Sequence, residues 1–262
     1  MKILYALLLA SFLPAPSTTI ARENIYDTIA RLLMPFIQVV AQESSSPNCA
    51  VALSVRLESM TNLPPEFIGA TAELALEAPD KLRVRAPIFG EELTLYRRGQ
   101  KLWVSPGERA AAILALAERE GKLPREDKKF RLAPFELPFP EKQLVFLPAL
   151  LQVQAAGEEV VDGAPCRVID LKLMPELARS LGVEGWSARV WVSKEDRLTR
   201  LRVARADWQI QVRVESLRFS PSLPAQTWQP TEGQDALEIS PTRYKQLLDS
   251  ISGGGKKEKK KK

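Results

Sequence analysis

Few residue types in this chain could carry chemistry, and the most informative type is one that is missing. The 262 residues contain no histidine. Serine–histidine–aspartate and cysteine–histidine nucleophilic sites, histidine-ligated zinc and histidine-ligated haem are therefore excluded. No phosphate-binding loop, dinucleotide-binding glycine pattern or calcium-loop spacing occurs either. We expect no metal, no cofactor and no enzymatic activity.

Neighbouring carboxylates are the remaining candidates for acid–base chemistry. Glu91–Glu92 and Glu158–Glu159 fall on predicted strands. Successive side chains of a strand point to opposite faces, so neither pair forms a shared site of the glycosidase type. We interpret these residues as solvated surface carboxylates.

The two cysteines, Cys49 and Cys166, gain meaning only if the protein is exported to an oxidising compartment. In that case they can form a disulfide, which closes a loop of more than about 100 residues and stabilises the fold by about 4 to 5 kcal/mol in the chain-entropy model. The alternative is two buried thiols, and the Cα separation decides between them.

The N-terminus has the features of a secretory signal peptide. Met1-Lys2 precedes an apolar run at 3–13, and small residues follow up to Ala21. The run is about half the roughly 20 residues that a spanning helix needs. We therefore predict a signal peptide at 1–21, cleaved before Arg22, and a periplasmic protein; the alternative is an uncleaved anchor.

The net charge of +5 comes from one end of the chain. Of 37 basic and 32 acidic residues, six lysines and one glutamate lie in 256–262, so the other 255 residues carry 31 of each. A neutral folded part has no basic footprint for nucleic acid. The lysine tail either binds an anionic membrane surface, at about 1 kcal/mol per lysine, or only keeps the chain soluble.

The elements that must position any site alternate between apolar and polar residues. Residues 24–41 place apolar side chains three and four apart, which predicts an amphipathic helix that is interrupted or kinked near Pro35. Five short strands with turn-like connections follow between residues 51 and 104, which favours an antiparallel meander. A helix is predicted over 108–120, and 144–151 is a short helix or an apolar loop.

Strands resume after this insertion. We expect them at 158–161, 166–173, 188–193, 198–205 and 208–219, with a short helix at 175–181 and a bulge in the last strand near Leu217. The predicted fold class is α+β: a strongly curved antiparallel half-barrel of about ten strands, with helices covering its concave apolar face. The predicted divisions are a half-barrel domain at 22–232, a C-terminal segment with a helix at 233–252, and a disordered tail at 253–262.

Several motifs resemble those of the LolA superfamily, which contains the periplasmic lipoprotein carrier LolA, the receptor LolB and the regulator RseB. The similar pieces are Leu74–Pro79 followed by Leu82–Arg85, the hairpin Tyr96–Pro106, and Val190–Leu198 before a long strand. The chain departs from the pattern at Arg98, where the family has aspartate. The family's tyrosine before the hairpin proline is missing, and Ala78 stands at the position of the lid-latching arginine.

The resemblance implies a carrier that binds the acyl chains of a lipoprotein or lipid and passes them between membrane-associated donor and acceptor proteins, towards the outer membrane. Residues 108–120 and 144–151 are then lid candidates, or else plain covering structure. The other function that the resemblance implies is an RseB-like module that senses lipid or protein.

Independently of the family, aliphatic side chains on the inward-facing positions of the strands suit the burial of an apolar ligand. The candidates for this lining are Val51, Leu53, Val55, Leu57, Leu74, Leu76, Leu82, Val84, Leu93, Leu95, Val190, Val192, Ile210 and Val212. The alternative is that they pack a dry core.

Overall fold

Strands make up much of the part of the chain that the structure describes. The structure is a computed structural model, and it describes residues 18–41, 47–61, 65–88, 91–119, 131–135, 147–180 and 182–244. The strands are β1 (Ala50–Met60), β2 (Thr71–Glu77), β3 (Lys81–Ile88), β4 (Glu91–Arg98), β5 (Lys101–Ser105), β6 (Leu151–Val161), β7 (Ala164–Leu173), β8 (Ser187–Val192), β9 (Leu198–Arg205), β10 (Trp208–Ser220) and β11 (Leu237–Ile239).

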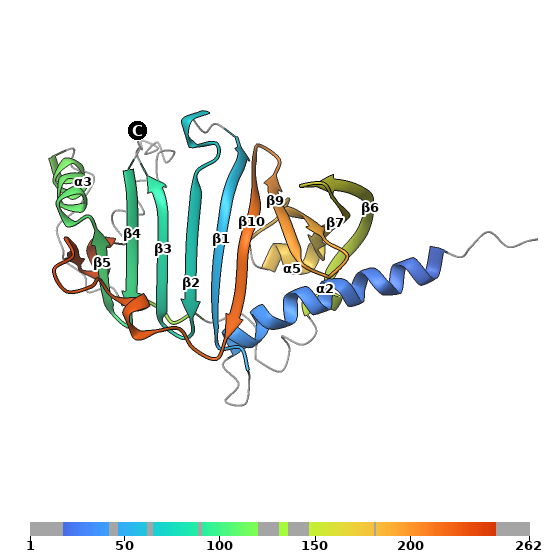
Figure 1. Cartoon of the computed structure of the whole chain (residues 1–262), viewed down its shortest axis with the longest axis horizontal. Helices are drawn as coiled ribbons and strands as arrows, with labels where there is room; N and C mark the ends of the chain where they lie inside the picture. Colours follow the sequence, from blue (N-terminus) through green and yellow to red (C-terminus); the bar gives the residue numbers. More distant parts are fainter. Residues whose placement is uncertain are drawn as a thin grey trace, which may run out of the picture.

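All of these strands belong to one antiparallel sheet. Its order is β11-β5-β4-β3-β2-β1-β10-β9-β8-β7-β6. Most neighbours are consecutive along the chain, but β1 pairs with β10 near the centre of the sheet (Figure 1). The two edge strands, β11 and β6, lie at opposite ends of this order, so the curved sheet is open rather than closed into a barrel.

Three α-helices and three short 3₁₀ helices accompany the described strands. They are α2 (Thr18–Ala41), α3 (Gly107–Arg119), α5 (Pro175–Ser180), η2 (Pro65–Phe67), η3 (Leu147–Leu150) and η4 (Ala225–Trp228). The largest, α2, crosses the sheet at its β6 end, and the N-terminal end of the helix projects beyond β6 (Figure 1). No helix in the described ranges combines the length and the apolar character needed to cross a bilayer.

The register of the strands gathers the aliphatic side chains on one face, which we call the apolar face. Directly paired residues of antiparallel strands share a face. Leu53 pairs with Leu74, Leu74 with Val84, and Val84 with Leu95. In β10 a bulge leaves Glu215 unpaired, because Ser54 pairs with Ser216 but Val55 pairs with Val214. The extra residue keeps the aliphatic residues before and after it on the apolar face.

Helix α2 packs on the β6–β9 part of the apolar face and forms the main core there. Ile29 is 1% exposed and clusters with Val153, Ile169, Val190 and Val192. These side chains come from α2, β6, β7 and β8, so burying them fixes the helix across the strands.

Two further sets of contacts hold the middle and the C-terminal part of α2 in place. Arg31 forms ion pairs with Asp27 of the same helix and, at 2.8 Å, with Asp196 in the β8–β9 turn. Nearer its C-terminus, Phe36 contacts Phe219 of β10 edge to face, with ring centroids 4.9 Å apart. The helix is thus tied to the strand end at which β10 finishes.

The α+β class, the single antiparallel sheet and the helical cover predicted from the sequence are confirmed. Eleven strands are present rather than about ten, because β11 was not expected, and β6 begins at Leu151 rather than at residue 158. The predicted helices over 24–41, 108–119 and 175–180 are present, and the helix continues through Pro35. The bulge near Leu217 is also present.

Several predictions fall wholly or partly outside the described residues. These are the signal peptide up to residue 17, most of the C-terminal helix, of which 241–244 are described as helical, and the Gly/Lys tail.

Candidate functional site

All fourteen predicted lining residues lie on the apolar face. Besides the row from Leu53 to Leu95, Val51 pairs with Leu76, which pairs with Leu82. On the other side of β1, Leu57 pairs with Val212. The strand registers place the remaining five members on this face as well: Val55, Leu93, Val190, Val192 and Ile210.

Burial divides this face into two parts. Under α2, Val190 is 6% exposed and Val192 is fully buried, so these two predicted lining residues belong to the packed core. Val51 and Leu93 are also buried. The others are only half-buried: Leu53, Val55, Leu57, Leu74, Leu76, Leu82, Val84, Leu95, Ile210 and Val212. The candidate site is therefore the part of the apolar face on β1–β5 and the adjoining β10.

A short segment at 131–135 crosses one end of the candidate site. The backbone N–H of Phe135 donates to the carbonyl of Pro79 in the β2–β3 turn, at 2.6 Å. The side chain of Gln100, in the β4–β5 turn, bonds both the N–H and the carbonyl of Leu132, at 2.9 Å each. The segment is thus held at the end of the sheet where the β2–β3 and β4–β5 turns lie.

Arg97 is the central contact between this segment and the sheet. It shares the apolar face with its partners Leu82 and Leu102, and it is 6% exposed. Its guanidinium donates to the carbonyls of Gly99, at 3.1 Å, and Ala133, at 2.5 Å, and stacks over the ring of Phe135 at 4.5 Å. An arginine so placed satisfies backbone carbonyls that would otherwise be buried without donors.

The electrostatics at Arg97 follow from its burial. Desolvation lowers the pKa of Arg97, and the charges of Asp80 and Tyr244 offset only part of this effect. Burial also raises the pKa of Tyr244, against the opposing effect of Arg97. The groups that contact the guanidinium directly are the two backbone carbonyls and the ring of Phe135, and the charge of Asp80 also favours its protonated form.

Arg97 was not among the residues predicted from the sequence. A signal for it exists, because Leu93, Leu95 and Arg97 occupy the same phase of one strand. A cation on an otherwise aliphatic phase indicates a buried polar contact, since an unpaired charge there would be costly.

Neither lid candidate, where described, lies over the middle of the candidate site. Helix α3 contacts β5 and β11 and stands at that edge of the sheet (Figure 1). Asp235 accepts from the backbone N–H of Glu108, and a side chain at Gly107 would collide with Asp235 and Ala236, so the helix start is fixed against β11. At the other edge, η3 contacts α2 and β6.

No disulfide joins Cys49 to Cys166 in the structure. Cys49 immediately precedes β1, whereas Cys166 is buried in β7, four strands away across the sheet. Four strand spacings amount to about 19 Å. A disulfide requires Cα atoms within about 7 Å, so the folded sheet keeps the pair apart.

Three of the four carboxylates considered for catalysis, Glu91, Glu92 and Glu159, are engaged in separate structural contacts. Glu91 pairs with Arg109 at 3.2 Å and Glu92 with Arg85 at 2.6 Å. Glu159 accepts from the indole N–H of Trp191 at 2.8 Å. Within the described ranges, no three acidic or cysteine side chains gather in a manner that could hold a metal ion.

Comparisons with known proteins give structural likenesses only. No protein-family model matches the chain, and no curated protein sequence matches it. The solved structures that resemble it include the lipoprotein LppX of Mycobacterium tuberculosis, at 15% identity and a TM-score of 0.35, over 74% of this chain and 97% of that one.

Two further structures are similar in the same way. The LolA superfamily protein NE2245 of Nitrosomonas europaea has 13% identity and a TM-score of 0.27, over 74% of this chain and 96% of that one. A chain in the MucA/MucB complex of Pseudomonas aeruginosa has 12% identity and a TM-score of 0.39, over 80% of this chain and 63% of that one. One of these proteins belongs to the superfamily that the sequence motifs resemble. All three TM-scores are below 0.5.

Proposed function

We propose that this chain is an exported, non-enzymatic carrier that binds the acyl chains of a lipoprotein or lipid on the half-buried part of its apolar face. The observation that carries the proposal is that helix α2 covers only part of the continuous apolar face. Under helix α2 the aliphatic residues Val153, Ile169, Val190 and Val192 of β6–β8 are buried, whereas most of those on β1–β5 and β10 are left half-buried.

The chemistry of this surface suits a hydrocarbon chain. The rows from Leu53 to Leu95 and from Val51 to Leu82 are aliphatic across neighbouring strands. Burial of a methylene group contributes about 0.8 kcal/mol and needs no directional contact. Such a surface binds any acyl chain of suitable length, and it supplies no group that could attack or protonate the ligand.

The remaining parts of the proposal concern location and partners. Export rests on the signal peptide predicted at 1–21. A carrier of this kind takes its cargo from one membrane-associated protein and gives it to another. The lysine tail at 256–262 remains a prediction of contact with an anionic membrane surface.

The proposal is tested by binding of a fluorescent fatty acid, 11-(dansylamino)undecanoic acid. The double substitution Leu74→Asn with Val84→Asn places two amides in directly paired positions of the apolar face. We expect the dissociation constant to rise about tenfold or more, because amide groups lose hydration when the chain covers them. Thr71→Asn, an exposed change on the opposite face of β2, is the matched control and should bind as the unsubstituted protein does.

An unchanged affinity in the double variant would contradict the proposed site. Mass spectrometry of the protein purified from its native envelope tests the cargo itself. Co-purifying lipid or lipoprotein supports transport, whereas a ligand-free protein in a stable complex with another protein contradicts it and favours a regulatory module.

A further inference from the structure

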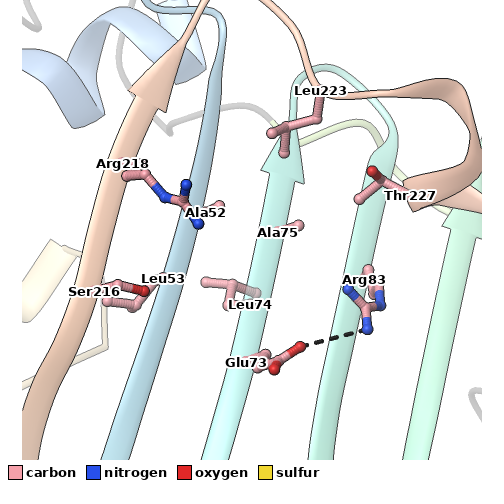
Figure 2. A pocket seen from close by; sticks show the side chains of 10 residues that line it. All are labelled: Ala52, Leu53, Glu73, Leu74, Ala75, Arg83, Ser216, Arg218, Leu223 and Thr227. Carbon is pink, nitrogen blue, oxygen red and sulfur yellow. Dashed lines mark ion pairs between the residues drawn. The ribbon is translucent and has the colours of Figure 1, made fainter.

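We propose that the opposite face of the sheet carries a second, independent binding site, which takes an oxyanion, phosphate or carboxylate, borne on a short apolar chain. The site is a cavity of about 260 Å³ formed by β10, β1, β2, β3 and the segment 221–230 that follows β10 (Figure 2). Leu53 and Leu74, two of its ten lining residues, also belong to the apolar face, whereas the other eight, including both arginines, take no part in the proposed acyl-chain site.

The floor of the cavity is one row of paired residues. Arg218 pairs with Ala52, Ala52 with Ala75, and Ala75 with Arg83. The methyl side chains on β1 and β2 thus lie between an arginine on β10 and an arginine on β3. Because the alanines project so little from the sheet, the row leaves a hollow with a cation at each end.

The roof of the cavity is the segment that follows β10. The backbone N–H of Leu223 donates to the carboxylate of Glu77 at 3.2 Å, and Arg98 donates to Gln229 at 3.1 Å. Between these points Trp228 is 2% exposed and lies under the ammonium group of Lys81. Leu223 and Thr227 are therefore held by contacts on both sides, at the end of the cavity beyond Ala75 and Arg83 (Figure 2).

The two arginines differ in their partners. Arg83 pairs with Glu73 at 3.4 Å, and Glu73 is also 3.6 Å from Arg85. Arg218 forms no ion pair with any residue in the described part of the chain, and its guanidinium lies over Ala52 (Figure 2). A guanidinium presents several N–H donors in a planar fork that fits phosphate and carboxylate oxygens.

Glu73 also lines the cavity, where its carboxylate pairs with Arg83, so Arg218 is the lining cation that no lining carboxylate neutralises. The hydroxyl groups of Ser216 and Thr227 supply further donors at the cavity. Its volume equals that of about eight or nine liquid water molecules, which exceeds the need of a bare anion. The alanine floor and Leu223 offer an apolar surface for the rest of the ligand, so the fitting ligand has an anionic end and a short hydrocarbon body.

Titration with three probes tests this site: inorganic phosphate, monobutyl phosphate and pentanoate, followed by amide chemical shifts in the full-length protein. We expect at least one alkyl anion to bind about tenfold more tightly than inorganic phosphate, with shifts at Ala52 and Ala75. Preference for the butyl phosphate or for pentanoate identifies the oxyanion as phosphate or carboxylate. Absence of binding by both alkyl anions, or equal binding of inorganic phosphate, overturns the proposal.

Substitutions locate the binding. Arg218→Ala should weaken the alkyl anion about tenfold, whereas Arg205→Ala, which removes the same charge at the exposed end of β9, should not. Ala52→Leu fills the hollow while keeping Arg218 and should also weaken binding. Equal effects of the two arginine changes, or full binding by the Ala52→Leu protein, overturn the assignment. Binding of the dansyl fatty acid should persist in all three, which separates this site from the acyl-chain site.

Discussion

At the scale of single residues, the face of the sheet on which a charged side chain lies determines which groups it contacts. Arg97 points to the apolar face and is buried against backbone carbonyls. Glu58 of β1 points to the opposite face, where Arg200 and Arg213 surround it. The first residue fixes a loop segment to the sheet, and the second joins strands β1, β9 and β10.

Replacing Arg97 should release the segment 131–135. Arg97→Met keeps much of the side-chain volume but leaves the carbonyl of Ala133 without its donor, so we expect the free energy of unfolding to fall by about 2 kcal/mol. Hydrogen exchange should also become faster at the amide of Phe135, which bonds Pro79.

Arg98→Met is the matched control for this change. Arg98 is exposed and bonds Gln229 on the other side of the sheet. It should leave the exchange of the Phe135 amide unchanged. Unaltered exchange in the Arg97→Met protein would show that the guanidinium does not hold the segment.

Glu58 should make stability depend on pH in the acidic range. Burial alone would raise its pKa, but hydrogen bonds from Arg200 and Gln211 and the charges of Arg200 and Arg213 outweigh this and lower it below 4.5. A lowered pKa in the folded state gives stability that is present above the pKa of the unfolded chain and is lost as pH falls through the folded value.

The variant Glu58→Gln isolates this contribution. At pH 7 we expect its free energy of unfolding to be about 2 kcal/mol lower than that of the unsubstituted protein. The difference should shrink as pH falls below 4.5, when the glutamate of the unsubstituted protein becomes protonated. Urea unfolding at pH 7 and pH 3.5 measures both values, and a difference that stays constant would exclude the ionised carboxylate as its source.

The sequence predicts well on which face of the sheet a side chain lies, but it predicts poorly which distant residues that side chain contacts. Alternation placed all fourteen aliphatic candidates on one face. It did not show that Val190 and Val192 lie under α2, because cover by a distant helix leaves no mark on a strand. The alternation also did not predict that Arg218 lies beside Ala52, since that contact depends on the pairing of β1 with β10.

At the scale of elements, α2 determines which part of the apolar face is core. Its residue Ile29 is 1% exposed and packs on the side chains of β6, β7 and β8, whereas Ile37 clusters with neighbours in the helix itself. The other half of the sheet keeps aliphatic side chains partly in contact with water. A surface of this kind costs stability in the ligand-free protein, which is expected of a binding surface rather than of a core.

The two halves should therefore respond differently to truncation. Ile29→Ala removes a fully buried side chain and should lower the free energy of unfolding by about 3 to 4 kcal/mol. Leu95→Ala, on the half-buried part of the same face, should lower it by about 1 kcal/mol. Chemical denaturation measures both. Equal losses would mean that the β1–β5 part of the face is packed as tightly as the part under α2.

Elements with strong periodic patterns were predictable, and weakly patterned ones were not. The helix over 24–41 and the strands from 51 to 104 show clear periods. The first half of β6 contains Ala155, Ala156 and Gly157, which carry little strand preference, and this half was missed. β11 has only three residues, and it is a strand because it pairs with β5.

At the scale of the whole molecule, one sheet offers two chemically different faces. One is aliphatic and shared between a helix-covered core and the candidate acyl-chain site. The other carries arginines, carboxylates and the cavity under residues 221–230. Without the lysine tail the chain is neutral, so any attraction of the folded part for anions is local rather than general.

The central pairing of β1 with β10 also sets the order in which the chain can fold. Every other neighbouring pair within β1–β5 and within β6–β10 consists of strands that are consecutive in the sequence, but Ala50 must find Ser220, 170 positions later. Loop closure over such a distance is slow compared with hairpin formation. Until β10 pairs with it, β1 has a partner on one side only, so the β1–β5 half of the sheet exposes an aliphatic strand edge that could pair with another chain.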